Sequence, residues 1–556
     1  MLLPIKLALS VAFVLSTSLM AQAQVADKEL NVYLRSDDGR SQLDALTNNA
    51  PETFNRVTLL DMGKNSLPLR RKLIEEAKSF IFITAPYWDN DPVGAGIAAA
   101  IKQRKREVPG FEDRYIMGWS TPLFSKGTGK ILKIVREDEN VLMWNSPLWQ
   151  RNFSFNLGGH EVHDKQIIVD GDKMIMGGMN MTQEYLEGGS KEHGWHDTDI
   201  FIEGPAAQVA TDAYLKIFTL GKYLAGPGHF SPFNPKKHGV LEENSEIKSF
   251  YNYFYKNKED HDFATIRIKG QDLMPGDYFI GPNEFQVMNR VHIGILPLLA
   301  SEKYHPPIAT DSSFNTSLRF LYDNPLIDRR IDTKHNEHYS KTRNTIKFLL
   351  DHAKESAWFF MPYLSLDKEF HDSLVAAAKH LNIKIITNSV ESNDMGVKSY
   401  KTAAPHYEDF LNAGIEIYEF VGNADLRKTI DANNSVIAEN EWPGKTLHSK
   451  VVLIDGAVAM IGSNNMNYRS FNKNNETMAL INDANFAAGV QSIFMRHFSS
   501  FEEAKTVTCR SRSSDDMMTI TKPPTIRRVD RAFFELMKAT YKFDDKPDFT
   551  PGLGKQ

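Results

Sequence analysis

Apolar and polar positions follow the same order in two long stretches of the chain. Residues 69–94 read as an amphipathic helix, an apolar strand and a turn with Pro and aromatic residues, and residues 342–367 read in the same way. A second helical stretch follows in each half, over Ala98–Lys105 and Leu374–His380, and then a short apolar run. Strands that alternate with helices are typical of α/β lobes with parallel or mixed sheets. The pattern therefore predicts an α/β fold with two similar lobes.

The repeat is clearest in two segments that align residue by residue. The first reads VHDKQIIVDGDKMIMGGMNMTQEY and the second reads LHSKVVLIDGAVAMIGSNNMNYRS. Aligned on histidine, the matching pairs are His163/His448, Lys165/Lys450, Asp170/Asp455, Gly171/Gly456, Gly177/Gly462 and Asn180/Asn465. One such match would be a modest signal, whereas two in register within matching halves indicate a duplication that has kept its chemistry.

Domain boundaries follow from this repeat and from the stretches that have no counterpart. We expect an N-terminal lobe over residues 24–220 and a C-terminal lobe over residues 314–505, each with one motif. Residues 221–313 are rich in Pro, Gly, Asn and Lys and read as an insertion plus linker, and residues 506–556 read as a C-terminal tail. A chain of 556 residues is too long for one ordinary core, which agrees with this division.

The first residues predict export. Residues 1–23 contain a short charged start, an apolar run and the small residues Ala21 and Ala23, as in a cleavable signal peptide. The alternative is an uncleaved N-terminal anchor, but the apolar run is short for a bilayer span, which needs about 20 residues. We therefore expect a periplasmic or secreted protein.

The aligned residues predict half of an active site in each lobe. Side chains alternate faces along a strand, so His163 and Lys165 point the same way. The Asp-Gly pair then makes a tight turn, and the returning strand brings the asparagine of the motif back towards the histidine. Each hairpin thus gathers an imidazole, an ammonium and a carboxamide: His163, Lys165 and Asn180 in the first half, and His448, Lys450 and Asn465 in the second.

This trio suits chemistry at a phosphodiester. Attack on phosphorus increases the negative charge on the equatorial oxygens, and lysine and asparagine donate to those oxygens. Two halves packed face to face across a pseudo-twofold axis would place one imidazole on each side of a single phosphate. One histidine can then attack phosphorus while the other protonates the leaving alcohol. The residues therefore predict one shared site.

Four carboxylates accompany the two motifs. Each histidine needs a partner on its other ring nitrogen to fix its tautomer, and the candidates are Asp197 and Glu476, which follow their respective hairpins. Asp170 and Asp455 lie a strand's length from the histidines. We expect these two to hold the turn and the neighbouring backbone rather than to transfer protons.

A metal site is not predicted. His160 and His163 have a spacing seen in metal sites, and His193 and His196 lie nearby in the sequence. Such a pair needs helical placement and a further ligand, whereas this segment reads as a strand.

On these residues the chain resembles the phospholipase D superfamily, whose signature is H-x-K-x4-D followed by G-[GS]-x-N, used twice in one site. The resemblance covers residues 55–501 apart from the insertion. Three stretches resemble bacterial phospholipase D-like proteins and cardiolipin synthases: GGMNMTQEY followed by WHDTDIFIEG, TNSVESND with HYEDFLNAGIEIYEF, and GSNNMNYRSFNKNNE.

The resemblance implies both a fold and a reaction. The fold would be two similar α-β-α sandwich lobes, the phospholipase D fold, related by a pseudo-twofold axis around one active site. The reaction would pass through a covalent phosphohistidine and need no metal or other cofactor. His163 would be the nucleophile, and His448 would act as acid and base.

We therefore expect a phospholipase D-type enzyme that acts on phospholipids, as a phosphodiesterase with water or a phosphatidyltransferase with an alcohol as acceptor. Because both half-sites lie on one chain, a monomer in peripheral contact with a membrane surface is expected. A secreted nuclease of the same superfamily is an alternative, but nucleases gain from a basic surface and the net charge here is -5, so no nucleic acid partner is expected. A catalytically silent lipid-binding module is another, and the complete set of site residues disfavours it.

Overall fold

The computed structural model describes most of both predicted lobes. The described residues are 25–118, 128–135, 140–144, 161–186, 194–225, 266–268, 271–273, 313–323, 331–332, 337–338, 340–389, 392–394, 397–420, 446–502 and 509–512. The predicted signal peptide, residues 1–23, and most of the predicted insertion and tail lie outside these residues. Their boundaries therefore stay predictions.

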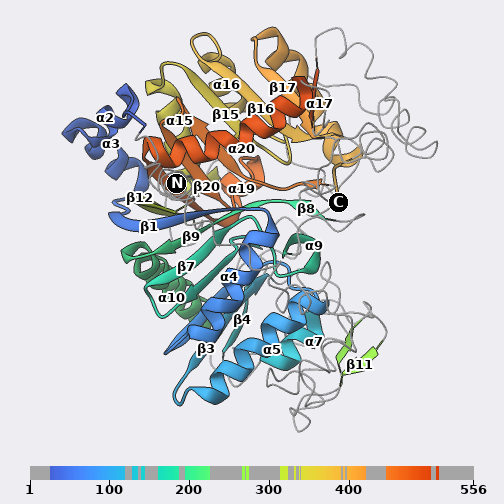
Figure 1. The fold of residues 1–556 in the computed structure, drawn as a ribbon. Coiled ribbons are helices and arrows are strands. Elements are labelled where there is room, and N and C mark those ends of the chain that lie inside the picture. Colours follow the sequence, from blue (N-terminus) through green and yellow to red (C-terminus); the bar gives the residue numbers. More distant parts are fainter. Residues whose placement is uncertain are drawn as a thin grey trace, which may run out of the picture.

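Helices and strands alternate through the first half of the chain, as the hydrophobic pattern predicts (Figure 1). In chain order the elements are α2 (Glu29–Arg35), α3 (Asp37–Thr47), β1 (Glu52–Asp61), α4 (Gly63–Glu76), β2 (Phe80–Ala85), α5 (Pro92–Glu107), β3 (Glu112–Gly118), α7 (Thr128–Val135), β4 (Val141–Trp144), β5 (Glu161–Val162), β6 (Gln166–Val169), β7 (Lys173–Gly177), α9 (Gln183–Leu186), β8 (Trp195–His196), β9 (Thr198–Glu203) and α10 (Pro205–Ala225).

The second half repeats this order. Its elements are β12 (Ser313–Asp323), β13 (Ile331–Asp332), β14 (Glu337–His338), α15 (Lys341–His352), β15 (Ser356–Phe360), α16 (Lys368–Ala377), β16 (Asn382–Asn388), α17 (Val397–Asn412), β17 (Glu416–Phe420), β18 (Thr446–Leu447), β19 (Val451–Ile454), β20 (Val458–Gly462), α19 (Tyr468–Asn472), β21 (Asn474–Asn482), α20 (Ala484–Glu502) and β22 (Cys509–Arg512). Between the halves, β10 (Ile266–Ile268) and β11 (Gln271–Leu273) pair with each other.

A single mixed sheet runs through both lobes, in the order β22-β17-β16-β15-β19-β20-β21-β12-β1-β9-β7-β6-β2-β3-β4. The lobes meet where β1 and β12 pair antiparallel, from Glu52 opposite Arg319 to Thr58 opposite Ser313. The prediction that the halves pack face to face is therefore wrong, because their sheets join edge to edge. This pairing satisfies the backbone groups that each half-sheet would otherwise leave exposed at its inner edge.

Helices cover both faces of the sheet and give each lobe an α-β-α sandwich, as expected for the fold class. The strands are buried on both faces, so adjacent residues face different cores. Ile167 packs in the core beneath α4 and α5, whereas Ile168 packs in the core shared by α10 and α20. Figure 1 shows the N-terminal lobe in blue and green beside the C-terminal lobe in yellow and red.

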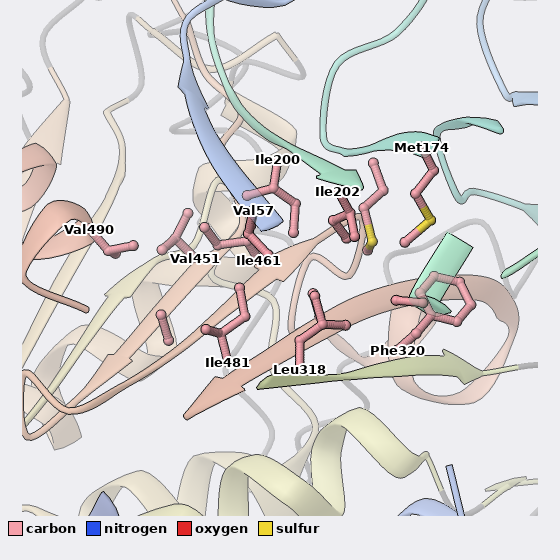
Figure 2. Close-up of a cluster of buried hydrophobic side chains, with 14 of the residues drawn as sticks. Val57, Met174, Ile200, Ile202, Leu318, Phe320, Val451, Ile461, Ile481 and Val490 are labelled. Carbon is pink, nitrogen blue, oxygen red and sulfur yellow. The ribbon is translucent and has the colours of Figure 1, made fainter. Parts of the chain in front are cut away.

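The core under α10 and α20 belongs to both lobes. Figure 2 shows side chains of this core from each half of the chain, all fully or almost fully buried. Those on strands are Val57, Met174, Ile200 and Ile202 from the first half and Leu318, Phe320, Val451, Ile461 and Ile481 from the second, and Val490 lies on α20. Burial of apolar surface stabilises by roughly 25 cal/mol per Å². The lobes therefore cannot separate without exposing this core, and the two motifs are held at a fixed distance.

The first two helices pack on the second lobe rather than the first. Leu30, Leu34 and Leu43 of α2 and α3 lie in the same core as α15 and α16. The buried Asn31 side chain donates to the Ala457 carbonyl, 2.8 Å away, and lies 2.6 Å from Asn482 Oδ1. Sequence order places these helices in the N-terminal lobe, but their contacts place them in the C-terminal one.

Among the described residues, no helix combines a bilayer-spanning length with the apolar character that a membrane span requires.

A pair of histidines lies between α16 and α17. His371 Nδ1 is 2.7 Å from His406 Nδ1, and Phe410 stacks on both rings. A hydrogen bond between two ring nitrogens needs one of them to accept, so at least one ring must be neutral. Burial lowers the pKa of His406 to about 3, and burial also lowers the pKa of His371.

These histidines predict a loss of stability in mild acid. The unfolded chain binds a proton at His406 near pH 6.5, whereas burial in the folded chain lowers the pKa of His406 to about 3. Unfolding therefore takes up a proton, and His406 should lower the free energy of unfolding by about 1.4 kcal/mol per pH unit below about pH 6. Urea unfolding at pH 7 and pH 5 would measure this. His406→Phe should flatten the dependence, and an equal slope in both proteins would contradict the interpretation.

Candidate active site

The two motifs form the two hairpins that the sequence predicts. His163 precedes β6, which turns back into β7, and His448 precedes β19, which turns back into β20. The turns use left-handed backbone at Asp170, with φ of 54°, and at Asp455, with φ of 53°. Aspartate tolerates this conformation better than most residues, which explains its place before glycine in both turns.

The carboxylates predicted to hold the histidines do so, but across the lobes. His163 Nδ1 lies 2.9 Å from Glu476 Oε1, and His448 Nδ1 lies 2.6 Å from Asp197 Oδ2. Each histidine is thus held by the carboxylate that follows the other hairpin, not its own. The partner leaves the Nε2 atom of each ring as the one available for chemistry.

Two short parallel strand pairings between the lobes place each histidine beside the carboxylate of the other lobe. β5 pairs with the start of β21, so that Val162 lies opposite Asn475. β8 pairs with β18, so that Leu447 lies opposite His196. Each segment that carries a histidine therefore lies beside the segment that carries a carboxylate of the other lobe. Neither half-site is complete on its own.

Both motif lysines are buried beside their histidines. Lys165 Nζ donates to the His163 carbonyl, 2.5 Å away, and Lys450 Nζ donates to the His448 carbonyl. Burial lowers the pKa of Lys165 to about 8, against the attraction of Glu476. Burial also lowers the pKa of Lys450 to about 7, against the attraction of Asp197. An anion bound between them would restore both charges, so the site is suited to a phosphate group.

Charges from both halves act on the histidines, so the two half-sites form one site. Burial, followed by Lys450 and Lys165, lowers the pKa of His448 well below its usual value. Burial likewise lowers the pKa of His163, against the attraction of Glu476. Both rings are therefore neutral at pH 7 in the empty site, and a neutral imidazole can attack phosphorus or accept a proton.

The carboxylates differ in their protonation behaviour. Burial raises the pKa of Asp197, although Lys450 opposes the rise. Burial also works against ionisation of Glu476, but attraction and a hydrogen bond from His163 hold its pKa below the usual value. The carboxylate beside His163 therefore ionises more readily than the carboxylate beside His448.

The two motif asparagines lie in the buried part of the site. Asn180 is 1% exposed and Asn465 is 6% exposed. Within the described part of the chain, neither carboxamide atom of Asn180 has a hydrogen-bond partner, nor does Asn465 Oδ1. Buried polar groups are nearly always paired, so these atoms are available to a ligand.

Asp170 and Asp455 hold backbone, as expected, and take no part in the site. Asp170 accepts from the backbone N–H groups of Lys78, Ser79 and Phe80 at 2.7–3.1 Å. Asp455 accepts in the same way from the N–H groups of residues 354–356 at 2.8–2.9 Å. Burial works against ionisation of Asp170, but its hydrogen bonds hold its pKa below the usual value.

Aromatic rings lie around His448, and sequence reasoning missed two of them, Tyr185 and Trp195. Tyr185 and Trp195 stack with centroids 4.7 Å apart, and His448 meets both rings edge-on, at 5.1 and 5.2 Å. Tyr363 contacts His448 in the same way, at 6.3 Å. The period of a strand could have identified Trp195, because it lies two positions before Asp197 and so shares its face.

Of the four histidines weighed as metal ligands, the structure describes His163 and His196, and each has a carboxylate partner. His196 pairs with Asp61, while His160 and His193 lie outside the described residues. The described part of the chain contains no cluster of three or more His, Cys, Asp or Glu side chains that could hold a metal ion.

Comparison with known proteins finds similar chains among cardiolipin synthases. The family model described as "Cardiolipin synthase, PLD-like domain" matches residues 346–498. The probable cardiolipin synthase YwiE of Bacillus subtilis is 20% identical over 465 residues, 84% of this chain and 70% of that protein. Cardiolipin synthase 1 of Bacillus cereus is 20% identical over 457 residues, 82% of this chain and 69% of that protein. Residues 346–498, which carry the second motif, thus match a phospholipase D-like family, and the chain as a whole is similar to cardiolipin synthases.

A solved structure supports the same fold. The crystal structure of phosphatidylserine synthase from Haemophilus influenzae aligns with a TM-score of 0.54, covering 90% of this chain and 98% of that one at 14% identity. The phospholipase D superfamily resemblance and the α/β fold class predicted from the repeated motifs are therefore confirmed.

The aspartate of the second motif gives a stability prediction. Asp455→Ala should lower the free energy of unfolding by about 3 kcal/mol, because three backbone donors lose a charged acceptor. Urea denaturation would measure the change. The control Asp372→Ala removes an exposed carboxylate that pairs with Lys368 and should cost less than about 0.5 kcal/mol. A stable but inactive Asp455→Ala protein would instead indicate a chemical role.

Proposed function

We propose that this protein transfers or hydrolyses the phosphatidyl group of phospholipids through a covalent phosphohistidine. The observation that carries the proposal is the pair of histidine–carboxylate contacts, each made across the lobes, with two buried lysines between them. The names of the relatives support a lipid substrate, because they are a probable and an assigned cardiolipin synthase.

The first step forms the covalent intermediate. The lone pair of His163 Nε2 attacks phosphorus, and the bond between phosphorus and the headgroup oxygen breaks with its electrons leaving on that oxygen. His448, protonated when substrate binds, gives its proton to the departing alkoxide, which leaves as an alcohol. Glu476 stabilises the positive charge that develops on the His163 ring.

The second step releases the product. Neutral His448 takes a proton from water or an acceptor alcohol, whose oxygen attacks phosphorus. The bond between nitrogen and phosphorus breaks, and its electron pair returns to His163. Water gives phosphatidic acid, and an alcohol gives a new phospholipid. His448 regains its proton and is ready for the next cycle.

The surroundings of the histidines support this order of roles. The His163 side chain is 18% exposed, whereas that of His448 is 5% exposed. The more exposed ring has room to carry a phosphatidyl group. The enclosed ring of His448 has the Asp197 carboxylate 2.6 Å away to stabilise its proton once an anionic substrate is bound. Lys165 and Lys450 would bind the phosphate oxygens, helped by the carboxamides of Asn180 and Asn465.

We favour an alcohol as acceptor, with hydrolysis as the competing reaction. Both curated relatives and the structural relative carry the names of synthases, and such enzymes pass a phosphatidyl group to an alcohol. The signal peptide predicted over residues 1–23 would place this activity outside the cytoplasm, at the surface of a membrane.

The test is a lipid-product assay. Wild type and His163→Ala are incubated with mixed phosphatidylcholine, phosphatidylethanolamine and phosphatidylglycerol, a primary alcohol and a chelator. Wild type should produce phosphatidic acid and phosphatidylalcohol, and His163→Ala should lower the rate by about 10⁴-fold, because the nucleophile is lost. The ratio of the two products separates transfer from hydrolysis.

His380→Ala is the matched control, because that histidine is exposed at the surface of the C-terminal lobe, away from the site. It should retain full activity. No lipid product from the wild type would overturn the proposal, and cleavage of DNA in chelator, lost in His163→Ala, would favour a nuclease.

A further inference from the structure

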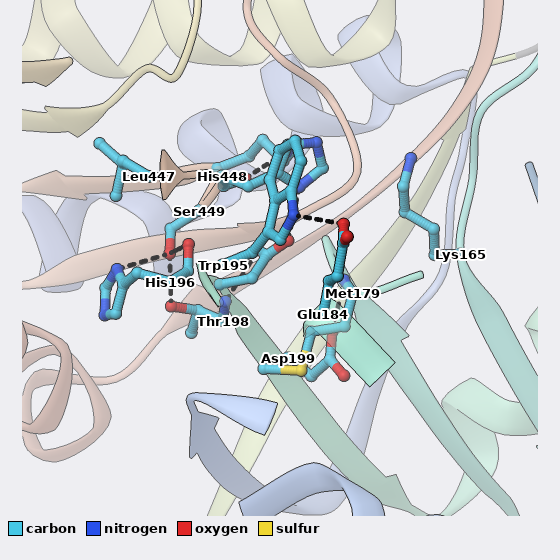
Figure 3. Close-up of polar contacts among 12 residues, drawn as sticks. Lys165, Met179, Glu184, Trp195, His196, Thr198, Asp199, Leu447, His448 and Ser449 are labelled. Carbon is cyan, nitrogen blue, oxygen red and sulfur yellow. Dashed lines mark hydrogen bonds and ion pairs between the residues drawn. The ribbon is translucent and has the colours of Figure 1, made fainter. Parts of the chain in front are cut away.

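The two segments that hold His448 alternate between two faces. Along residues 195–198, Trp195 and Asp197 contact His448. His196 and Thr198 point to the opposite face and contact Ser449, the residue that follows His448. Figure 3 shows Ser449 joined to His196 and Thr198, with the Trp195 ring beside His448.

On that opposite face, four side chains form a closed ring of polar contacts, which we call the back-face ring. His196 Nε2 lies 3.2 Å from Asp61 Oδ1, and its Nδ1 lies 3.4 Å from Ser449 Oγ. Thr198 Oγ1 lies 3.1 Å from Ser449 Oγ and donates to Asp61 Oδ1, 3.3 Å away. His196, Thr198 and Ser449 are almost fully buried, so the ring is held away from water.

The back-face ring is continuous with the His448–Asp197 contact. The His448 N–H donates to the His196 carbonyl, 2.7 Å away, and the Thr198 N–H donates to Asp197 Oδ1, 2.8 Å away. A shift of either segment would therefore disturb both the ring and the 2.6 Å contact between His448 and Asp197. Side chains behind a catalytic pair commonly fix its orientation in this way.

Among the described residues, the equivalent positions of the other half form no such ring. The positions equivalent to His196, Thr198 and Ser449 are Asn475, Thr477 and Asp164. Within the described residues, neither side-chain atom of Asn475 has a hydrogen-bond partner, nor does Thr477 Oγ1. The His163–Glu476 pair is held in another way, because Ser463 Oγ donates to Glu476 Oε2, 2.6 Å away, and Asn474 Nδ2 donates to Glu476 Oε1, 3.2 Å away.

We propose that His196, with Asp61, is a positioning residue that fixes His448 for proton transfer. The inference rests on the proposed function, in which His448 is the acid and base while His163 is the nucleophile. A histidine that only moves a proton gains from a fixed ring.

The leaving group provides the test, because only a poor leaving group needs the proton of His448. A phospholipid releases an alkoxide, which must be protonated. A p-nitrophenyl phosphodiester releases p-nitrophenolate, which leaves without a proton when His163 attacks and the bond from phosphorus to oxygen breaks. If the His448 ring is no longer held in place, the reaction of the phospholipid should slow. The rate at which the p-nitrophenyl diester forms the phosphohistidine should stay the same.

The variants are His196→Gln and Thr198→Val, with Thr477→Val as the matched control at the equivalent position of the other half. On a phospholipid, we expect His196→Gln to lower kcat by about 10- to 100-fold, with KM changed less than about twofold. Thr198→Val should lower kcat by a smaller factor, and Thr477→Val should match wild type. In stopped flow with the p-nitrophenyl diester, the rate constant of the first nitrophenolate burst should be unchanged in all three.

Two results would overturn this proposal. One is a kcat on phospholipid that is equal to wild type in both His196→Gln and Thr198→Val. The other is a burst rate that falls in parallel with kcat, which would show general damage to the site. If the wild-type protein releases neither an alcohol from the phospholipid nor nitrophenolate from the diester, the proposed function is overturned, and this inference with it.

Discussion

Everything in this site depends on contacts that cross between the lobes. Glu476 contacts His163 Nδ1 and Asp197 contacts His448 Nδ1. The tautomer of each ring is therefore fixed by a carboxylate from the opposite half of the chain. The short pairings of β5 with β21 and of β8 with β18 bring these groups together. A lobe on its own would have a histidine and a lysine but no carboxylate to orient the ring. The two halves therefore work only as a pair.

The continuous sheet fixes the two lobes relative to each other, and with them the histidine–carboxylate contacts that cross between the lobes. β1 and β12 join the half-sheets, and the core under α10 and α20 draws side chains from both lobes. Because that core is buried throughout, a relative movement of the lobes would expose apolar surface. The site is thus held at fixed spacing by the sheet and the shared core.

Burial disfavours the positive charges of the site, and an anion would stabilise them. Burial lowers the pKa of Lys165 to about 8 and that of Lys450 to about 7. A bound phosphodiester would raise both pKa values. The negative charge that develops during attack would then lie between groups already in place, which is how preorganised sites lower barriers.

The sequence by itself determined the chemistry and the local elements. Two in-register copies of His, Lys, Asp and Asn predicted the hairpins, the supporting role of Asp170 and Asp455, and the α/β alternation, because each depends on neighbours close in the chain. Only the tertiary structure decided which carboxylate holds which histidine, that the half-sheets join edge to edge, that α2 and α3 pack on the second lobe, and that His196 lies behind His448 with Asp61. These depend on contacts between residues more than 100 positions apart, which no local pattern encodes.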